Sequence, residues 1–169
     1  DLEGNWIKNE NIKIYDLTYK EILNYDVGSI NKLSRYGRRF LNQKSLPNQK
    51  IPKLSDIFEL INLNDIKDVV LNLEIKSTPV EDNLTPPPKE IVRIVKKVIE
   101  KSKLEEKILI SSFDWRVLKE FSLQMPNISR GYLSFQQKTG VKIEKTIYKN
   151  SPWMNLTLEF DEYDLQGLI

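Results

Sequence analysis

The segment of residues 69–76 constrains the fold of this chain more than any other. It reads Val-Val-Leu-Asn-Leu-Glu-Ile-Lys and ends at Ser-Thr-Pro, a pattern typical of a short β-strand. Because side chains alternate across a strand, the apolar odd-numbered positions share one face and the even-numbered positions share the other. We therefore expect a strand with an apolar face and a second face that carries Asn72, Glu74 and Lys76 toward its carboxyl end.

The charged end of this strand permits two interpretations. An acid and a base two residues apart at the carboxyl end of a strand occupy the place where α/β barrels carry their chemistry. The alternative is an ordinary sheet strand with one solvated face and a Glu/Lys pair in water, as in many antiparallel sheets. The pattern of residues 69–76 alone does not choose between them.

The residues that follow predict two βαβ units. A helix is expected over 89–103, a strand over 107–113, a helix over 115–124 with Asp114 as its cap, and a third strand over 130–135. Strands that alternate with helices favour a parallel sheet with right-handed crossovers, as in a barrel. The apolar stripe expected to face the sheet from the first helix is Ile91, Ile94, Val95, Val98 and Ile99.

Two other regions leave alternatives open. Residues 35–40, Arg-Tyr-Gly-Arg-Arg-Phe, are basic and aromatic, and form either a solvated loop or a patch that faces an anion or a lipid headgroup. Toward the carboxyl end, residues 141–148 fit a strand or a helix, and a further helix is expected over 161–169.

Composition excludes several classes of site and partner. The 169 residues contain no Cys and no His, which excludes cysteine nucleophiles, zinc–thiolate sites and histidine general bases within the chain. With 26 basic and 24 acidic residues, interspersed along the chain, nucleic acid is not expected as a partner. No apolar run approaches the roughly 18 residues of a membrane span. We expect a cytoplasmic protein, although a targeting segment could precede Asp1; the oligomeric state stays open.

Several motifs together resemble the glycerophosphodiester phosphodiesterase family. Leu-Asn-Leu-Glu-Ile-Lys at 71–76 resembles the central strand motif of that family, and Ile-Ser-Ser-Phe at 110–113 is similar to its next strand motif. Residues 14–29, followed by Ile-Pro-Lys-Leu at 51–54, resemble its inserted segment. The resemblance implies an α/β fold, a TIM-type (β/α)8 barrel of which this chain supplies only a part. Residues 1–50 would form the inserted segment and residues 51–169 the central portion of the barrel.

The same resemblance implies roles for three residues. Glu74 would be a ligand of the catalytic divalent metal, Mg²⁺ or Ca²⁺; Lys76 would face the substrate phosphate; and Phe113 would lie beside the glycerol. The implied activity is metal-dependent hydrolysis of a small-molecule phosphodiester, a glycerophosphodiester, to glycerol 3-phosphate and an alcohol.

Other parts of the family pattern are not found. Its histidine motifs, its paired metal carboxylates and its closing strands have no counterpart here, and a (β/α)8 barrel needs about 250 residues. We interpret the chain as a fragment of an enzyme and expect the fragment alone to be inactive. The alternatives are a catalytically inactive barrel fragment or binding module, in which Glu74 and Lys76 are a mere ion pair, and a related barrel phospholipase acting on lipid phosphodiesters.

Overall fold

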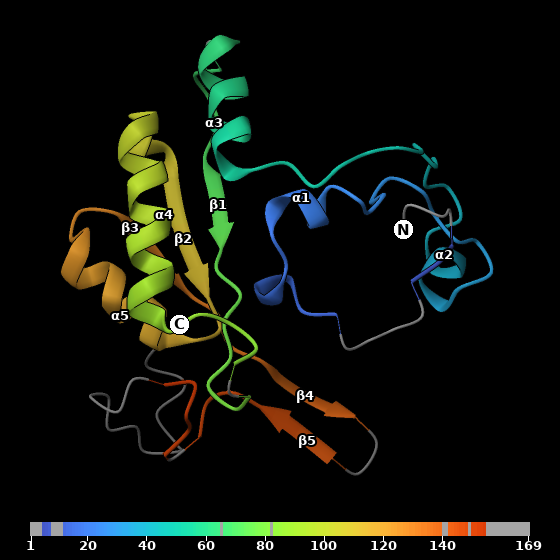
Figure 1. Ribbon diagram of the computed structural model, residues 1–169. Coiled ribbons are helices and arrows are strands. Elements are labelled where there is room, and N and C mark those ends of the chain that lie inside the picture. The colour runs from blue at the N-terminus through green and yellow to red at the C-terminus, as the bar shows by residue number, and fades with distance from the viewer. Residues whose placement is uncertain are drawn as a thin grey trace. The chain divides into compact units, whose positions relative to one another are not determined.

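The computed structural model describes residues 5–7, 12–64, 66–81, 83–139, 142–148 and 150–154 (Figure 1). The chain divides into two units, Asp1–Ile57 and Phe58–Ile169. The helix expected over 161–169 lies outside the described residues. No helix in the described ranges has the length and apolar content that a membrane crossing requires.

A three-stranded parallel sheet organises the second unit. Its strands are β1 (Leu71–Glu74), β2 (Ile108–Ser112) and β3 (Ser129–Tyr132), which lie side by side in chain order. Glu74 is in register with Ser111, which in turn pairs with Gly131. The predicted parallel, adjacent arrangement is therefore confirmed, and the antiparallel alternative for residues 69–76 is wrong.

The strand β1 is shorter than expected, but its alternation continues beyond its last residue. The Ile75 amide donates to the Ser111 carbonyl oxygen at 2.8 Å, so the ladder with β2 extends past Glu74. Leu71, Leu73 and Ile75 are half-buried, whereas Asn72, Glu74 and Lys76 are exposed. The two faces predicted for this segment are those that the structure shows.

Two helices form the crossovers that a parallel sheet requires. Helix α4 (Pro88–Ser102) leads from β1 to β2 by way of the short helix η2 (Glu105–Lys107), and α5 (Trp115–Gln124) leads from β2 to β3. The two helices pack together and lie beside the sheet in Figure 1. The side chains that form this core are fully or almost fully buried: Val92, Ile99, Ile108, Ile110, Val117, Leu118 and Phe121.

The expected apolar stripe of α4 was wrong at one position. Ile94 is 46% exposed, whereas Val92, which the stripe omitted, is fully buried. At about 100° per residue, positions 92, 95 and 99 lie on one side of a helix and position 94 lies nearly opposite Val92. The buried side of α4 is therefore turned about the helix axis from the predicted stripe, toward the line of Val92 and Ile99.

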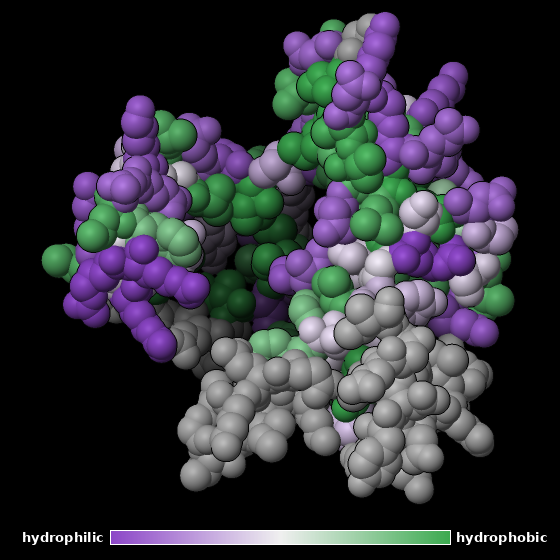
Figure 2. All heavy atoms as spheres, turned by 180° about the vertical axis from the view of Figure 1, so that it is seen from behind, coloured by the Kyte–Doolittle hydropathy of each residue, from purple (hydrophilic) through white to green (hydrophobic). Residues whose placement is uncertain are grey.

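The remaining elements of the second unit are a helix and a hairpin. Helix α3 (Leu54–Leu63) contains the boundary between the units; it buries Phe58 and Ile61, and the amide group of Asn62 donates to the carbonyl oxygen of Ser102 at 3.1 Å. Apolar side chains also reach the surface around α3 (Figure 2), among them Leu60 and Leu63. The strands β4 (Gln136–Thr139) and β5 (Lys142–Lys145) are antiparallel, so residues 142–145 form a strand rather than a helix.

The first unit contains little regular structure. Its elements are η1 (Ile14–Asp16), α1 (Tyr19–Ile22) and α2 (Arg35–Arg39). Helix α1 begins with a capping box in which the side chains and amides of Thr18 and Glu21 bond reciprocally, an arrangement that satisfies amides at the start of a helix. Gly28 is required where the loop returns, since a Cβ there would lie 1.9 Å from the carbonyl oxygen of Leu46.

The core of the second unit predicts a large loss of stability for Phe121→Ala. Phe121 is fully buried, and truncation of a buried phenylalanine costs about 3–5 kcal/mol through lost burial and the cavity that remains. The matched variant Leu123→Ala alters the same helix at a side chain that is 65% exposed and should cost less than about 0.5 kcal/mol. Denaturant unfolding measures both; equal losses would contradict this assignment of the core.

Candidate functional site

The candidate site lies at the carboxyl ends of the three parallel strands. Parallel strands place these ends at one edge of a sheet, where α/β proteins bind their ligands. Because register partners in adjacent strands point to the same side, Glu74 shares a face with Ser111 and Gly131. The other face carries Ile108 and Ile110, which are buried. The polar face is therefore the one that the crossover helices leave open.

Glu74 and Lys76 form an ion pair on this face. The Lys76 Nζ atom lies 2.9 Å from Glu74 Oε1, with side-chain exposures of 83% for Lys76 and 36% for Glu74. A pair this exposed contributes about 0–1 kcal/mol to stability. Each group can therefore leave its partner and bind a ligand at little cost in free energy. The pair is equally compatible with an ordinary surface ion pair that binds no ligand.

Ser111 fixes the position of Asn72 beside this pair. The buried Ser111 hydroxyl donates to Asn72 Oδ1 at 2.8 Å. Asn72 precedes Glu74 by two residues on β1, so their side chains project from the same face. The sequence pattern predicted the Asn72 position but gave no indication that Ser111 would hold its side chain.

A buried carboxylate, Asp114, holds the loops that follow β1 and β2. Asp114 is fully buried and accepts a hydrogen bond from the Ser77 hydroxyl at 2.7 Å. Its two oxygens accept from Arg116 Nε at 2.9 Å and Nη2 at 2.8 Å, and its Oδ1 also caps α5 through the Arg116 amide at 3.1 Å. These contacts join the loop after Glu74 to the turn between β2 and α5.

The Asp114–Arg116 contact stabilises the charged form of the arginine. The pKa of Arg116 is raised above its ordinary value, chiefly because the Asp114 carboxylate accepts its hydrogen bonds, with partial burial acting in the opposite direction. The guanidinium is thus charged at every accessible pH. The sequence predicted Asp114 only as a helix cap; the Asp-x-Arg spacing was the signal for its second role.

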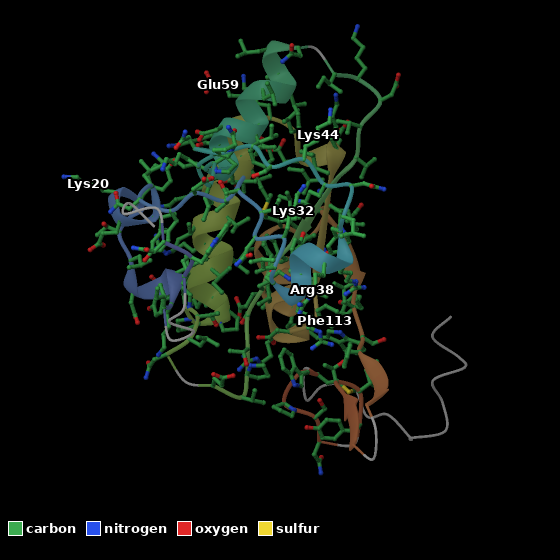
Figure 3. The ribbon with its side chains drawn as sticks, turned by 90° about the vertical axis from the view of Figure 1, so that its right-hand side faces the viewer. Lys20, Lys32, Arg38, Lys44, Glu59 and Phe113 are labelled. Atoms are coloured by element: carbon green, nitrogen blue, oxygen red, sulfur yellow. The ribbon has the colours of Figure 1, made fainter. Side chains whose placement is uncertain are left out.

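Phe113 directly follows β2 and is half-buried (Figure 3). Glu74 and Lys76 come from the end of β1, and Phe113 comes from the end of the adjacent strand. The structure therefore brings the three expected residues to two neighbouring strand ends. Their roles toward metal and substrate stay predictions.

The oxygen donors near Glu74 fit one side of a site for a hard cation. Mg²⁺ and Ca²⁺ prefer carboxylate, carbonyl and water oxygens. Glu74 carries a carboxylate and Asn72 an amide carbonyl, both exposed on β1. Within the described ranges, however, no group of three or more His, Cys, Asp or Glu side chains could hold a metal ion. These residues therefore fit part of a coordination shell, with Glu74 as its one carboxylate.

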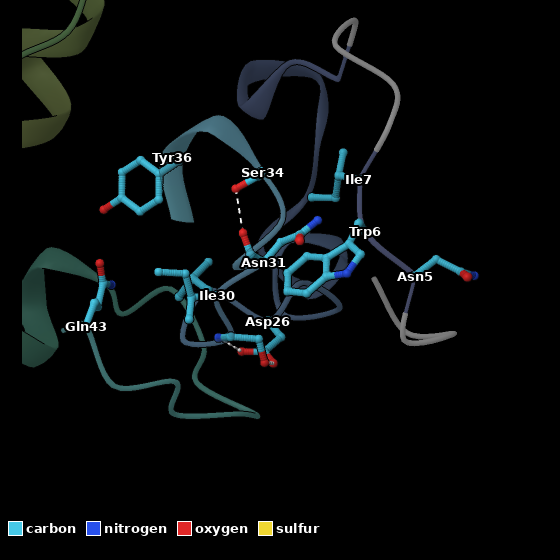
Figure 4. A pocket seen from close by; sticks show the side chains of 11 residues that line it. Asn5, Trp6, Ile7, Asp26, Ile30, Asn31, Ser34, Tyr36 and Gln43 are labelled. Atoms are coloured by element: carbon cyan, nitrogen blue, oxygen red, sulfur yellow. Dashed lines mark hydrogen bonds between the residues drawn. The ribbon is translucent and has the colours of Figure 1, made fainter. Parts of the chain in front are cut away.

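A separate cavity lies within the first unit (Figure 4). It has a volume of about 570 Å³, and its lining includes Trp6, Ile30 and Tyr36. Asp26 is the one charged group among the described residues that line it. Its pKa is lowered, first by the hydroxyl of Ser29 and then by backbone amides including that of Gly28. A negative lining does not suit a phosphate group, so the cavity is not the candidate phosphodiester site.

Comparisons with known proteins relate the chain to one kind of enzyme. It is 32% identical over 120 residues to the glycerophosphodiester phosphodiesterase of Caldanaerobacter subterraneus subsp. tengcongensis, an alignment that covers 71% of this chain and 41% of that protein. A crystal structure assigned to a glycerophosphoryl diester phosphodiesterase from Silicibacter pomeroyi matches with a TM-score of 0.71 and 31% identity, over 79% of this chain and 45% of the other. No family model matches the chain.

The chain spans less than half the length of either relative. The family resemblance inferred from the motifs is confirmed by these relatives, and the α/β class with a parallel sheet is confirmed by the structure. The closed eight-stranded barrel stays a prediction.

The Asp114 contacts predict that Asp114→Asn destabilises the second unit by about 1–3 kcal/mol, because the buried group loses its charge-assisted bonds to Arg116. The matched change Asp68→Asn neutralises an exposed acid and should cost less than about 0.5 kcal/mol. Urea unfolding of the two variants measures the difference. If both variants unfold at the same urea concentration, Asp114 does not hold these loops.

Proposed function

The chain belongs to the glycerophosphodiester phosphodiesterase family over the part that it spans, and we propose that the protein containing it hydrolyses glycerophosphodiesters to glycerol 3-phosphate and an alcohol. One observation carries the proposal. Glu74 and Lys76 lie together on the open face of β1 where the parallel strands end. This combination supplies a carboxylate for a cation and an ammonium for a phosphate at the edge where such folds bind ligands.

The proposed fold of the whole domain is a (β/α)8 barrel. The open polar face supports this fold, because the helices of a barrel cover only the outer face of the sheet, and the inner face is surrounded by the strands themselves. In the described part of the chain, α4 and α5 cover the apolar side of the sheet, and the side with Asn72 and Glu74 is exposed. In a barrel, Glu74 would point toward the axis at the rim.

Each residue has a distinct proposed task. Glu74 would bind a divalent cation, Mg²⁺ or Ca²⁺, through its carboxylate, and Asn72 would offer a neutral oxygen beside it. When bound, the cation would supply Lewis-acid polarisation of the phosphoryl group. Lys76, whose ammonium is largely exposed, would donate a charge-assisted hydrogen bond to a phosphate oxygen. Phe113 would give the glycerol an apolar wall.

We propose that proton transfer comes from other groups of the whole protein. The 169 residues contain no histidine, and no shared group of carboxylates surrounds Glu74 within the described residues. We therefore propose that this chain alone binds parts of the substrate but does not hydrolyse it.

A second candidate is a catalytically inactive barrel fragment or binding module. The observation that favours it is the absence of histidine from the chain, together with a Glu74–Lys76 pair that an ordinary exposed ion pair explains equally well. The two candidates differ in what the loss of the Glu74 charge does to turnover.

The proposal predicts that Glu74→Gln in the whole protein lowers turnover of glycerophosphocholine on the order of 100-fold. The amide keeps the shape of the side chain but removes the charge that holds a hard cation. Because Glu74 is exposed, the free energy of unfolding should change by less than about 0.5 kcal/mol. Release of glycerol 3-phosphate measures the rate, and calorimetric titration with Mg²⁺ measures the affinity for the cation.

Glu100→Gln is the matched control. Glu100 also pairs with a lysine, Lys96, at an exposed position on α4, so its substitution removes the same charge from the same kind of pair. It should leave turnover unchanged. A Glu74→Gln protein with unchanged turnover and unchanged Mg²⁺ affinity would remove Glu74 from the site and favour the binding module.

A further inference from the structure

The positive charge of the chain is concentrated in one segment of the first unit. Residues 27–55 contain seven lysines and arginines and no aspartate or glutamate, whereas the rest of the chain has 19 basic and 24 acidic residues. The expectation that charges are interspersed along the whole chain is therefore wrong for this segment. A net charge of +2 conceals a strongly basic segment attached to an acidic remainder.

The same segment exposes large apolar side chains. We call residues 32–46 the basic–apolar segment. Three of its five basic residues, Lys32, Arg38 and Lys44, are labelled in Figure 3. Leu33 is 84% exposed, Leu41 is 71% exposed and Leu46 is 59% exposed. Tyr36 and Phe40 are exposed as well. Five large apolar side chains thus lie in water among five cations, a combination that solvation of a loop alone does not explain.

Helix α2 forms the middle of the basic–apolar segment. The Ser34 hydroxyl oxygen caps the helix by accepting a hydrogen bond of 2.9 Å from the Gly37 amide. Gly37 is buried against the preceding turn, where a Cβ would lie 2.1 Å from the carbonyl oxygen of Asn31. The glycine side of the helix therefore faces the protein. The three arginines of α2 are exposed, and Tyr36, which lines the cavity of the first unit on one side, is also largely exposed.

The aromatic and cationic groups of α2 are interleaved. The rings of Tyr36 and Phe40 lie 4.8 Å apart, and the Arg39 guanidinium lies 5.5 Å from the centre of the Phe40 ring. Among the residues that the structure describes, no ion pair involves a basic side chain of the basic–apolar segment. The segment thus combines exposed apolar side chains with cations that have no acidic partner among the described residues.

We propose that the basic–apolar segment binds the surface of a bilayer that contains anionic lipids. Lysines and arginines near such a surface gain electrostatic attraction, and leucine and aromatic side chains enter the headgroup region. The combination of the two is what distinguishes a lipid surface from a nucleic acid, which would use the cations but leave Leu33 and Leu41 in water. Attachment of this kind is peripheral and requires no helix that crosses the membrane.

The proposal does not depend on the phosphodiesterase proposal, because residues 32–46 include none of the candidate site residues and binding is measured without turnover. The test is sedimentation of the purified protein with sucrose-loaded vesicles. We expect strong binding to vesicles of phosphatidylcholine with phosphatidylglycerol, and weak binding to phosphatidylcholine alone. Raising the salt to about 1 M, which shortens the Debye length to about 3 Å, should reduce binding to the anionic vesicles.

Two variants and one control separate the contributions. Arg38→Gln with Arg39→Gln should lower the partition coefficient on anionic vesicles by tenfold or more, at roughly fivefold per cation. Leu33→Ser with Leu41→Ser alters only exposed side chains and should also weaken binding several-fold, with the residual binding more sensitive to salt. The control, Lys97→Gln with Lys101→Gln on α4, removes the same charge from exposed positions outside the segment and should change binding less than twofold.

Three results with vesicles would overturn the proposal, and so would a fourth, with DNA. The vesicle results are equal binding to neutral and anionic vesicles, equal loss in the control and in the Arg38/Arg39 variant, and unchanged binding in the Leu33/Leu41 variant. Displacement of the protein from anionic vesicles by an equal phosphate concentration of duplex DNA would also overturn it, because the segment would then act as a general polyanion site.

Discussion

The parallel pairing of β1 with β2 is the constraint on which the described part of the second unit depends. Parallel neighbours cannot be joined by a tight turn, so a crossover of a dozen or more residues must lie between them, and α4 supplies it. The pairing also places the carboxyl ends of β1, β2 and β3 at one edge. Every residue of the candidate site is positioned by this one arrangement.

The two faces of the sheet have different tasks as a result. The apolar face, which includes the fully buried Ile110, lies beneath α4 and α5, and the fully buried Phe121 of α5 belongs to the same core. The opposite face carries polar groups that contribute little to folding, since the Glu74–Lys76 pair is largely exposed. Substitutions on the polar face can therefore affect ligand binding without unfolding the protein. The contacts of the buried Asp114 hold together the loop that follows β1 and the turn that follows β2, next to the polar face.

Local patterns in the sequence predicted the strands and their order. The alternation over 69–76 and the strand–helix–strand succession were sufficient for a parallel sheet, because crossover connections follow strict rules. The helical stripe of α4 was predicted less well. Ile94 is apolar but faces solvent, and Val92 is the buried residue, because the rotation of a helix is set by the whole sheet surface rather than by its own sequence.

Features that join distant parts of the chain were not predictable in this way. The contact between Ser77 and Asp114 spans 37 positions, and that between Asn72 and Ser111 spans 39; neither leaves a local pattern. The concentration of charge over residues 27–55 was visible in the sequence but is hidden by the net charge of the whole chain. The residue types of the candidate site could thus be predicted, but not the hydrogen bonds that hold them.

The position at which a divalent cation binds in the whole protein decides whether Glu74 is a metal ligand. Mn²⁺ can replace Mg²⁺ at oxygen sites and broadens the NMR signals of nearby nuclei, so a titration maps the site without any assumption about catalysis. We expect the signals of Asn72, Glu74 and Ser111 to broaden first, and we expect this broadening to be lost in Glu74→Gln. Broadening confined to other residues, with these three signals unchanged at saturating Mn²⁺, would contradict the central claim that this strand end is the metal site.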